Sequence, residues 1–294
     1  MSAIDSTTDI TLSDKAPSRT SRQTFFTRAR RSPTLVIGIV LLVLLVLASA
    51  FAPLLTPFSP TAQHLGSGLL APSWTHPFGT DELGRDIMSR MLYAGRTDLR
   101  IAFLAAAAPF VVGIVVGLLS GYFGGPLDFV IGRVVDTVIA FPFYVIVVAL
   151  VFVIGVGEFG IYVAFALVGW VGYARVVRAS TRSMRSAGWV DAARGGGLSH
   201  FRVILRHLLP NVLPLAVVLL ATEIILIMVA VVTLGYLGLG VQSPTPDWGT
   251  MIQDGQNFVT TKWWLSAIPG VAVIYTGISL SLIGDGLGDA WRIR

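Results

Sequence analysis

Long apolar runs alternate with short polar segments along most of this 294-residue chain. A helix needs about 17–25 predominantly apolar residues to cross a bilayer. Six runs approach that length, and one of them is interrupted at Pro142: residues 35–51, 101–121, 138–155, 159–174, 213–234 and 266–284. The pattern predicts an all-α integral membrane protein with six transmembrane helices.

The first apolar run has two interpretations. Ser32 and Pro33 are suited to the N-cap and the first position of a helix. The triplet Ala48-Ser49-Ala50 is also typical of a signal-peptide cleavage site. The run is longer than a usual signal core and further spans follow it, so we favour a retained first helix.

Composition supports a membrane protein. Hydrophobic residues make up 54% of the chain and charged residues only 13%, with a mean hydropathy of +0.77, whereas soluble domains carry about 25% charged residues. The net charge of +5 could suit nucleic acid, but 16 of the 21 Lys and Arg residues fall on one side of the six-span topology. Positive residues favour the cytoplasmic side, so we expect both termini there and no nucleic-acid partner.

Segment 76–91 contains two possible ion pairs, Asp81 with Arg85 and Asp86 with Arg90. Residues spaced by four lie on one face of a helix, and acids suit its first turn. Three apolar residues would line another face, Leu83, Ile87 and Met91. The pattern predicts a helix lying at the membrane surface. The arginine partners favour a structural role for these acids over a catalytic or metal-binding one.

Two features inside the predicted spans are unusual. Gly113, Gly117 and Gly121 repeat every four residues, which allows close helix packing in lipid. Glu223 lies near the middle of the fifth span, where an ionisable group is costly in hydrocarbon. We expect Glu223 to face the protein interior or a transport pathway. A hydrogen-bonded packing role and a contact with substrate both stay open.

The polar loop before the fifth span begins with an acid and two alanines, Asp191, Ala192 and Ala193, which suit a short helix. Gly195, Gly196 and Gly197 follow, each costing about 1 kcal/mol relative to alanine in a helix interior. Because an isolated peptide would not hold this shape, we expect a partner surface to complete it.

This loop resembles the EAA loop of ABC-importer permeases. The residues in the positions of that motif are Asp191, Ala192, Ala193, Gly197, Ile204, Leu209 and Pro210, and His207 and Asn211 match the ending seen in the dipeptide/oligopeptide branch. The resemblance implies that a helix over residues 190–201 docks in a groove of a separate ATPase. It assigns ATPase coupling to Asp191, Ala192, Ala193, Gly197, Ile204, His207 and Pro210.

Three further stretches resemble the same branch: residues 76–86, 235–249 and 284–289. The match is to the second, C-type permease subunit and implies a type I ABC importer permease fold. The implied partners are a second homologous permease, two ATP-binding cassette subunits, an extracytoplasmic substrate-binding protein and membrane lipid. The implied location is the bacterial plasma membrane.

Some positions depart from the family pattern. Asp191 replaces the usual Glu and reaches one methylene less far, and Gly195 and Gly196 replace bulkier residues. Val231 stands where many relatives have an acid, so a substrate role for that acid does not carry over.

The predicted organisation is a cytoplasmic tail (1–32), a first helix with an extracytoplasmic segment (33–98), a permease core (99–285) and a cytoplasmic C-terminal tail (286–294). The core includes the coupling loop 179–209 and the extracytoplasmic loop 235–264.

The sequence argues against several other functions. Neither lysine follows a glycine, so no P-loop is present and ATP and Mg would be bound by the partner ATPase. We expect no catalytic, cofactor or metal site in this chain. A secondary transporter is a remote alternative, because no convincing repeat accompanies Glu223. Dipeptides or oligopeptides are the expected cargo, with nickel, glutathione or a glycoside as alternatives on the same architecture.

Overall fold

The structure is a computed structural model that describes residues 28–291, so most of the predicted tail 1–32 and residues 292–294 lie outside the described residues. Its helices, in chain order, are α2 (Pro33–Ala50), α3 (Ala52–Leu55), α4 (Ile87–Phe123), α5 (Gly125–Ile139), α6 (Phe143–Ile154), α7 (Glu158–Val168), α8 (Trp170–Arg185), α9 (Gly188–Gly195), α10 (His200–Val203), α11 (Leu209–Tyr236), α12 (Trp248–Gly255) and α13 (Trp264–Trp291).

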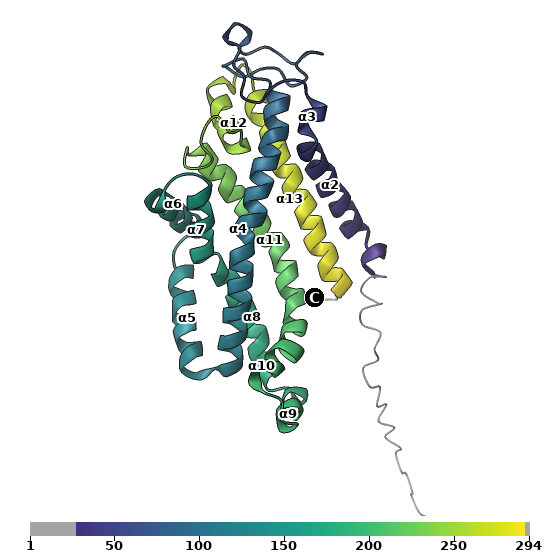
Figure 1. Ribbon diagram of the computed structural model, residues 1–294, viewed down its shortest axis with the longest axis vertical. Coiled ribbons are helices and arrows are strands. Elements are labelled where there is room, and N and C mark those ends of the chain that lie inside the picture. Colours follow the sequence, from purple (N-terminus) through teal and green to yellow (C-terminus); the bar gives the residue numbers. More distant parts are fainter. Residues whose placement is uncertain (1–27, 292–294) are drawn as a thin grey trace, which may run out of the picture.

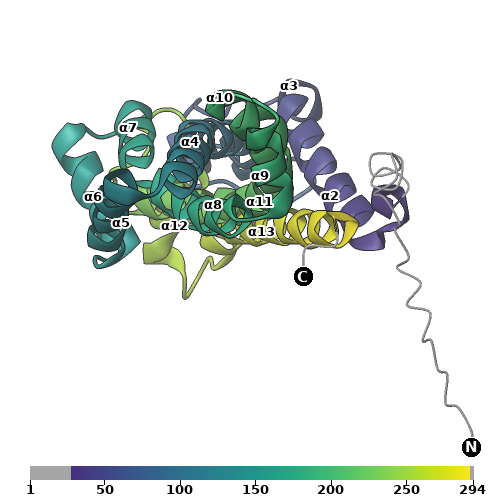
Figure 2. The same cartoon turned by 90° about the horizontal axis from the view of Figure 1, so that it is seen from below.

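The helices form an elongated body organised around α4 and α11 (Figure 1). α13 and α2 lie on one side of this pair, and α5 to α7 lie on the other. The segment before α4 and the helix α12 occupy one end of the body, here called the α12 end. α9 and α10 protrude at the opposite end, here called the α9 end. Seen from below, the long helices form a broad, shallow layer (Figure 2).

The prediction of an all-α membrane protein with six spans agrees with the helix lengths. Five helical segments are long and apolar enough to cross a membrane: Pro33–Ala50, Ile87–Phe123, Glu158–Arg185, His200–Tyr236 and Trp264–Trp291. A sixth crossing is available if α5 and α6, which meet at 90°, count as one broken span.

The first helix begins as predicted. The Ser32 hydroxyl accepts a hydrogen bond from the Leu35 backbone N–H at 3.4 Å, and Pro33 is the first helical residue. α2 then packs tightly on α13, where a Cβ on Gly38 would lie 2.8 Å from the backbone of Ser279. This close packing favours a retained helix over a cleaved signal peptide.

The predicted surface helix near residue 81 is wrong. Gly84 has φ +72°, a left-handed conformation that interrupts a helix, and α4 begins only at Ile87 with Asp86 as its N-cap. The Asp81 carboxylate instead accepts hydrogen bonds from the backbone N–H groups of Leu83 and Arg85. α4 then continues without a break through the predicted second span and measures 37 residues.

The third and fourth spans differ from their predicted limits. α5 starts at Gly125, thirteen residues before the predicted start of the third span at residue 138, and the break follows at residues 140–142. Pro142 lacks a backbone N–H donor, which explains why the helix is interrupted there. The fourth span is longer than predicted because α7 and α8 together reach Arg185.

The glycine face on α4 packs as predicted against α8. A Cβ on Gly117 would lie 2.7 Å from the Val177 Cβ, and a Cβ on Gly121 would lie 2.7 Å from the Arg178 carbonyl oxygen. Larger side chains would separate the two helices.

Some of the predicted segment borders coincide with helix ends and others do not. The loop 235–264 fits the interval between α11 and α13, whereas residues 98 and 285 fall inside α4 and α13.

Candidate coupling loop and pathway cavity

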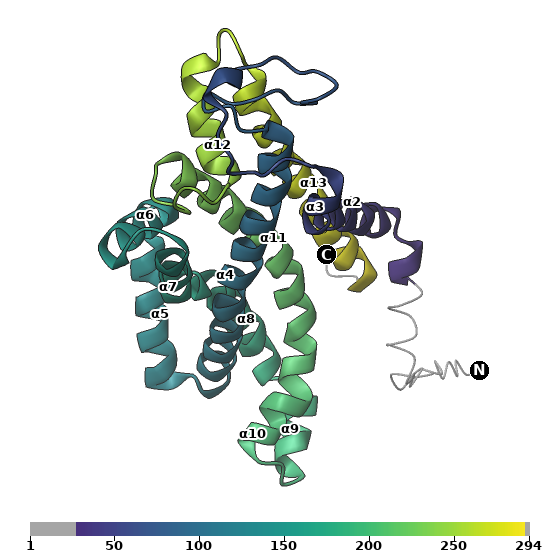
Figure 3. The same cartoon turned by 45° about the horizontal axis from the view of Figure 1, so that its top comes forward.

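The predicted helix 190–201 is wrong in length, because two helices and a turn occupy this region (Figure 3). α9 ends at Gly195, and Gly197 turns the chain with φ +82°. The Gly197 N–H donates to the Arg194 carbonyl at 2.9 Å, and the Leu198 N–H donates to the Ala193 carbonyl at 3.2 Å. These bonds satisfy carbonyls at the helix end, as glycine C-terminal motifs do. The predicted helix therefore extended across the turn that these glycines make.

α9 has two different faces. Val190 is fully buried against the body of the protein, and Ala193 packs partly against the same apolar cluster. Asp191 and Ala192 are exposed, as is Gly195. The outer face therefore carries an acid beside small residues, which leaves its backbone open to close approach.

The inner face of the loop is anchored by an apolar cluster. Ile204, 6% exposed, packs there with Val203 and Leu208, and α4 and α8 contribute Leu118 and Val177 among others. Ile204 therefore has a packing role in this chain, below the exposed surface of the loop.

A polar junction at Tyr122, near the end of α4, joins both short helices of the loop. The Tyr122 hydroxyl lies 2.8 Å from His200 Nδ1 and accepts a hydrogen bond from Arg194 Nε at 3.1 Å. The Arg194 guanidinium also lies 4.8 Å from the centre of the Tyr122 ring, within the range of a cation–π contact. No pattern in the sequence reveals this junction, because Tyr122 is separated from its partners by more than seventy residues.

Pro210 follows a π-helical turn, Ile204–Leu208. A proline ring clashes with the carbonyl four residues earlier and supplies no N–H, so a local widening of the helix accommodates it. His207 is half-buried in this turn, with its ring 6.2 Å from that of Trp189 on α9. Pro210 itself is exposed. Pro210 and His207 thus shape the connection between α9 and α11.

Glu223 lies apart from the loop, on the wall of a cavity of about 450 Å³. The cavity is lined by the α5–α6 break, the α7–α8 junction and α11. Besides Glu223, Tyr144 is the lining residue with a polar side-chain group, its hydroxyl. The remaining lining residues are apolar or glycine.

The α12 end is held by buried charged groups. Arg85 Nε donates to Asp81 Oδ2 at 2.6 Å, and Arg90 Nε lies 3.6 Å from the same oxygen. Both guanidinium groups also reach Asp254 Oδ2, at 3.1 and 3.4 Å. The predicted Asp81–Arg85 pair is confirmed, although these residues lie in a turn. The predicted Asp86–Arg90 pair is wrong, because Asp86 caps α4 and its Oδ1 lies 2.8 Å from His76 Nδ1.

The helix α12 is fixed to α4 by Trp248. Its backbone N–H donates to Asp98 Oδ2 at 2.9 Å, and its indole N–H donates to the Met91 carbonyl at 3.1 Å. Trp248 is 1% exposed. The segment around residues 76–86 and the loop 235–264 therefore pack together at the α12 end.

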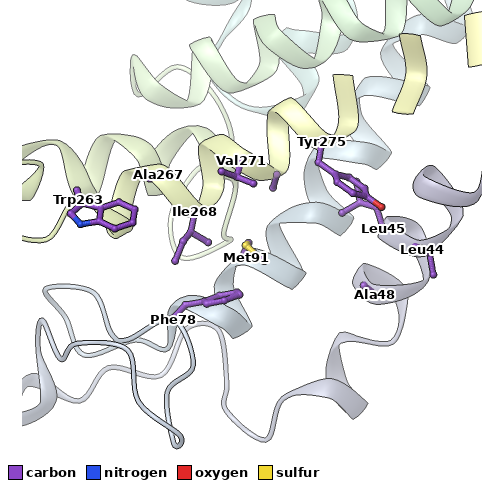
Figure 4. A pocket seen from close by; sticks show the side chains of 11 residues that line it. Leu44, Leu45, Ala48, Phe78, Met91, Trp263, Ala267, Ile268, Val271 and Tyr275 are labelled. Carbon is purple, nitrogen blue, oxygen red and sulfur yellow. The ribbon is translucent and has the colours of Figure 1, made fainter. Parts of the chain in front are cut away.

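A larger cavity of about 510 Å³ lies between α2, α13 and the start of α4 (Figure 4). Leu44, Met91, Ile268 and Val271 are among its lining side chains, with Phe78 at one end. Tyr275 and Trp263 are the lining residues with polar side-chain atoms, and none of the lining residues is charged. Such apolar walls suit lipid chains or other apolar groups, so we place no site for a charged substrate in this cavity.

No group of three or more His, Asp or Glu side chains within residues 28–291 is placed to hold a metal ion.

Comparison with known proteins agrees with this architecture. Residues 113–292 match the family described as binding-protein-dependent transport system inner membrane component, and residues 20–72 match the N-terminal transmembrane domain of oligopeptide transport permease C. A probable D,D-dipeptide transport system permease protein of Escherichia coli is 35% identical, covering 92% of this chain and 93% of the relative. A dipeptide transport system permease protein of Alkalihalophilus pseudofirmus is 33% identical, covering 90% of this chain and 87% of the relative.

A chain of the MetNI methionine ABC transporter, solved in inward-facing conformations, shares the fold at 18% identity and a TM-score of 0.55. The alignment covers 68% of this chain and 94% of that chain. The predicted ABC importer permease fold is therefore confirmed. This multi-pass inner membrane protein belongs to the family of binding-protein-dependent transport system inner membrane components and is a permease subunit of an ABC importer, distinct from the subunit that hydrolyses ATP.

Proposed function

We propose that this chain is the second permease subunit of a peptide importer and that α9 couples it to a separate ATPase. The observation that carries the coupling proposal is the outer face of α9, where Asp191 and Ala192 are exposed on a helix whose opposite side is buried. Small residues permit close approach of a partner, and an acid offers it a charge-assisted contact worth about 1.5–3 kcal/mol. Gly197 shapes the turn beside this face. Ile204 packs in the apolar cluster on the inner side of the loop, and His207 and Pro210 shape the connection from α9 to α11.

The proposed cargo is a dipeptide or short oligopeptide. Support comes from the relatives, several of which are dipeptide transport permeases, and from the match of residues 20–72 to an oligopeptide permease domain. A binding-protein-dependent system includes a substrate-binding protein and an ATPase. We assign two ATPase subunits and a second homologous permease to this complex, with ATP and Mg bound by the ATPases.

The proposed orientation places the α9 end and both termini in the cytoplasm. It is supported by the concentration of Lys and Arg residues on that side of the topology. A reporter fused after Arg185 should behave as cytoplasmic and one fused after Asp254 as extracytoplasmic. The opposite pattern would refute the proposed orientation.

The docking proposal is tested by adding bulk to the outer face of α9. Ala192→Trp should abolish co-purification of the ATPase and ATP-dependent uptake, because a close-packed interface does not absorb extra volume without strain. Asp191→Asn should weaken both only in part. Ala193→Trp should also abolish association, but Ala193 packs partly against the chain's own apolar cluster, so Ala192→Trp is the cleaner variant.

The matched control is Ala71→Trp, an equal change at an exposed position near the α12 end. It should leave ATPase association unchanged. Full association of Ala192→Trp, with membrane insertion equal to wild type, would show that α9 is not the docking element.

A further inference from the structure

Glu223 is an acid without a polar partner in the middle of a membrane-spanning helix. It lies near the centre of α11, and within residues 28–291 its carboxylate makes no hydrogen bond or ion pair. Several other acids of the described chain are paired, including Asp81 with Arg85, Asp128 with Arg178 and Glu158 with Arg100. An ionisable group at this depth is expensive and marks a functional position unless a partner satisfies it.

The fold leaves room for this carboxylate. Gly172 on α8 faces it, and a Cβ at Gly172 would lie 3.0 Å from Glu223 Oε1. The carboxylate therefore occupies a recess made by a glycine and opens into the cavity of about 450 Å³. A larger residue at position 172 would restrict it.

The break between α5 and α6 forms another part of the cavity wall. Phe141, Pro142 and Tyr144 line the cavity where the two helices meet at 90°. Irregular backbone at membrane depth is stable only where protein covers it or where it lines a watery cavity. The break and the acid thus lie on one cavity.

The open side of the cavity is therefore incompatible with lipid. Glu223 is only partly buried, and Leu226 one turn further along α11 is 40% exposed. A carboxylate that reaches the surface at this depth needs water, a partner cation or a cationic substrate beside it.

We propose that Glu223 and this cavity form a subsite of the transport pathway that receives the positively charged amino group of the peptide. The inference rests on the proposed function as a peptide importer. The carboxylate supplies the counter-charge, and the apolar walls, such as Val138 and Phe143, accommodate the side chain next to the amino group. This combination favours a cation joined to an apolar group over an anion of equal size.

The test uses the absence of cysteine from this chain, so that one introduced thiol gives a clean signal. Leu226→Cys places that thiol on the cavity wall, one helical turn from Glu223. The whole transporter, with cysteine-free partner subunits and its binding protein, is reconstituted in liposomes. Two methanethiosulfonates of similar size are compared, one carrying a trimethylammonium group and the other a sulfonate.

When each rate is divided by the same reagent's rate with a free thiol in solution, the cationic reagent should modify Leu226→Cys about tenfold faster than the anionic one, equivalent to ~1.4 kcal/mol. Adding Glu223→Gln should bring the ratio close to one, and Glu223→Asp should retain most of it. Alanyl-alanine should slow the modification, while N-acetyl-alanyl-alanine should not. Asp289→Asn removes an exposed acid at the far end of α13 and should leave the ratio unchanged.

Three outcomes would overturn the inference. A ratio unaffected by Glu223→Gln would show that this carboxylate does not govern the cavity. Equal protection by both peptides would show that the amino group is not recognised there. Inaccessibility to both reagents, as expected for Ile274→Cys on an exposed apolar face of α13, would place the cavity against lipid or a partner helix. ATP-dependent peptide uptake by the wild-type transporter is measured in the same liposomes, and its absence would count against the proposed function instead.

Discussion

The two ends of this permease are stabilised in different ways. At the α12 end, Asp81, Arg85 and Arg90 are each less than a tenth exposed, and they meet one another and Asp254 across two segments distant in sequence. At the α9 end, the acid of the short helix is exposed and makes no ion pair among the described residues. The α12 end pairs these three charged groups within the chain, whereas the α9 end presents a charge that a partner can pair with.

One helix connects the two ends. α4 carries Arg90 near its start and Tyr122 near its finish. At about 1.5 Å per residue, its 37 residues extend roughly 55 Å, longer than a bilayer is thick. The buried ion pairs fix the start of α4, and the Tyr122 junction attaches the loop to its other end. A displacement of α9 therefore acts on a helix that is anchored at the opposite end.

The largest expected effect comes from breaking the buried charge network. Asp81→Ala leaves Arg85 and Arg90 without their shared acid and removes two backbone hydrogen bonds. Removing one partner of a buried ion pair costs about 3–5 kcal/mol. We expect a marked fall in the thermal denaturation temperature of the purified complex and lower yield from the membrane.

The matched control is Glu158→Ala, which breaks the more exposed pair with Arg100. An exposed pair contributes about 0–1 kcal/mol, so its denaturation temperature should stay near wild type. Equal effects of the two variants would show that burial does not distinguish the pairs.

An intermediate effect is expected at the α9 end. Tyr122→Phe keeps the ring but removes the hydroxyl shared by Arg194 and His200. Each lost hydrogen bond costs about 0.5–1.5 kcal/mol, so hydrogen exchange over residues 188–203 should become faster while α4 remains folded. ATPase association should weaken more than thermal stability does.

Tyr236→Phe provides the comparison, because its hydroxyl donates to Gln256 at the α12 end at 2.7 Å. It should leave both exchange at the loop and ATPase association unchanged. Unchanged exchange in Tyr122→Phe would mean that the apolar cluster alone holds α9 and α10.

The membrane spans were largely predictable because lipid imposes a simple length rule on apolar runs. The glycine repeat on α4 was predictable too, since its spacing alone puts three small residues on one face. The residues at which the spans begin and end were harder to predict from the sequence. Asp128 precedes the predicted third span 138–155 but lies within α5, where Arg178 and Arg182 of α8 neutralise it. The sequence does not show such pairings across distant segments.

Some features of the candidate sites were likewise predictable from the sequence, and others depend on tertiary contacts. The motif around Asp191 was visible in the sequence, although the predicted helix 190–201 ran across the left-handed Gly197. The length of α9 was not predictable, because propensity alone does not place the end of a helix among three glycines. Tyr122, His200 and Asp254 gained their roles only through tertiary contacts. The cavity around Glu223 also depends on a helix break whose 90° angle no local pattern specifies.

The smallest effect is expected from a second acid at the α12 end. Asp247 is 1% exposed and caps α12 by accepting a hydrogen bond from the Thr250 N–H at 3.0 Å. Burial raises the pKa of Asp247 above its ordinary value of 3.8, although hydrogen bonds from Thr250 oppose this shift. A raised pKa means that the folded state disfavours the ionised carboxylate, so this group's contribution to stability falls as pH rises above 3.8.

Asn caps helices about as well as Asp and carries no charge. Asp247→Asn should therefore change the denaturation temperature least of the three variants, with the Asn variant gaining relative to wild type as pH rises toward neutrality. A large loss of stability at neutral pH would show that ionised Asp247 is needed, and that its attraction to Arg90 outweighs the cost of burial.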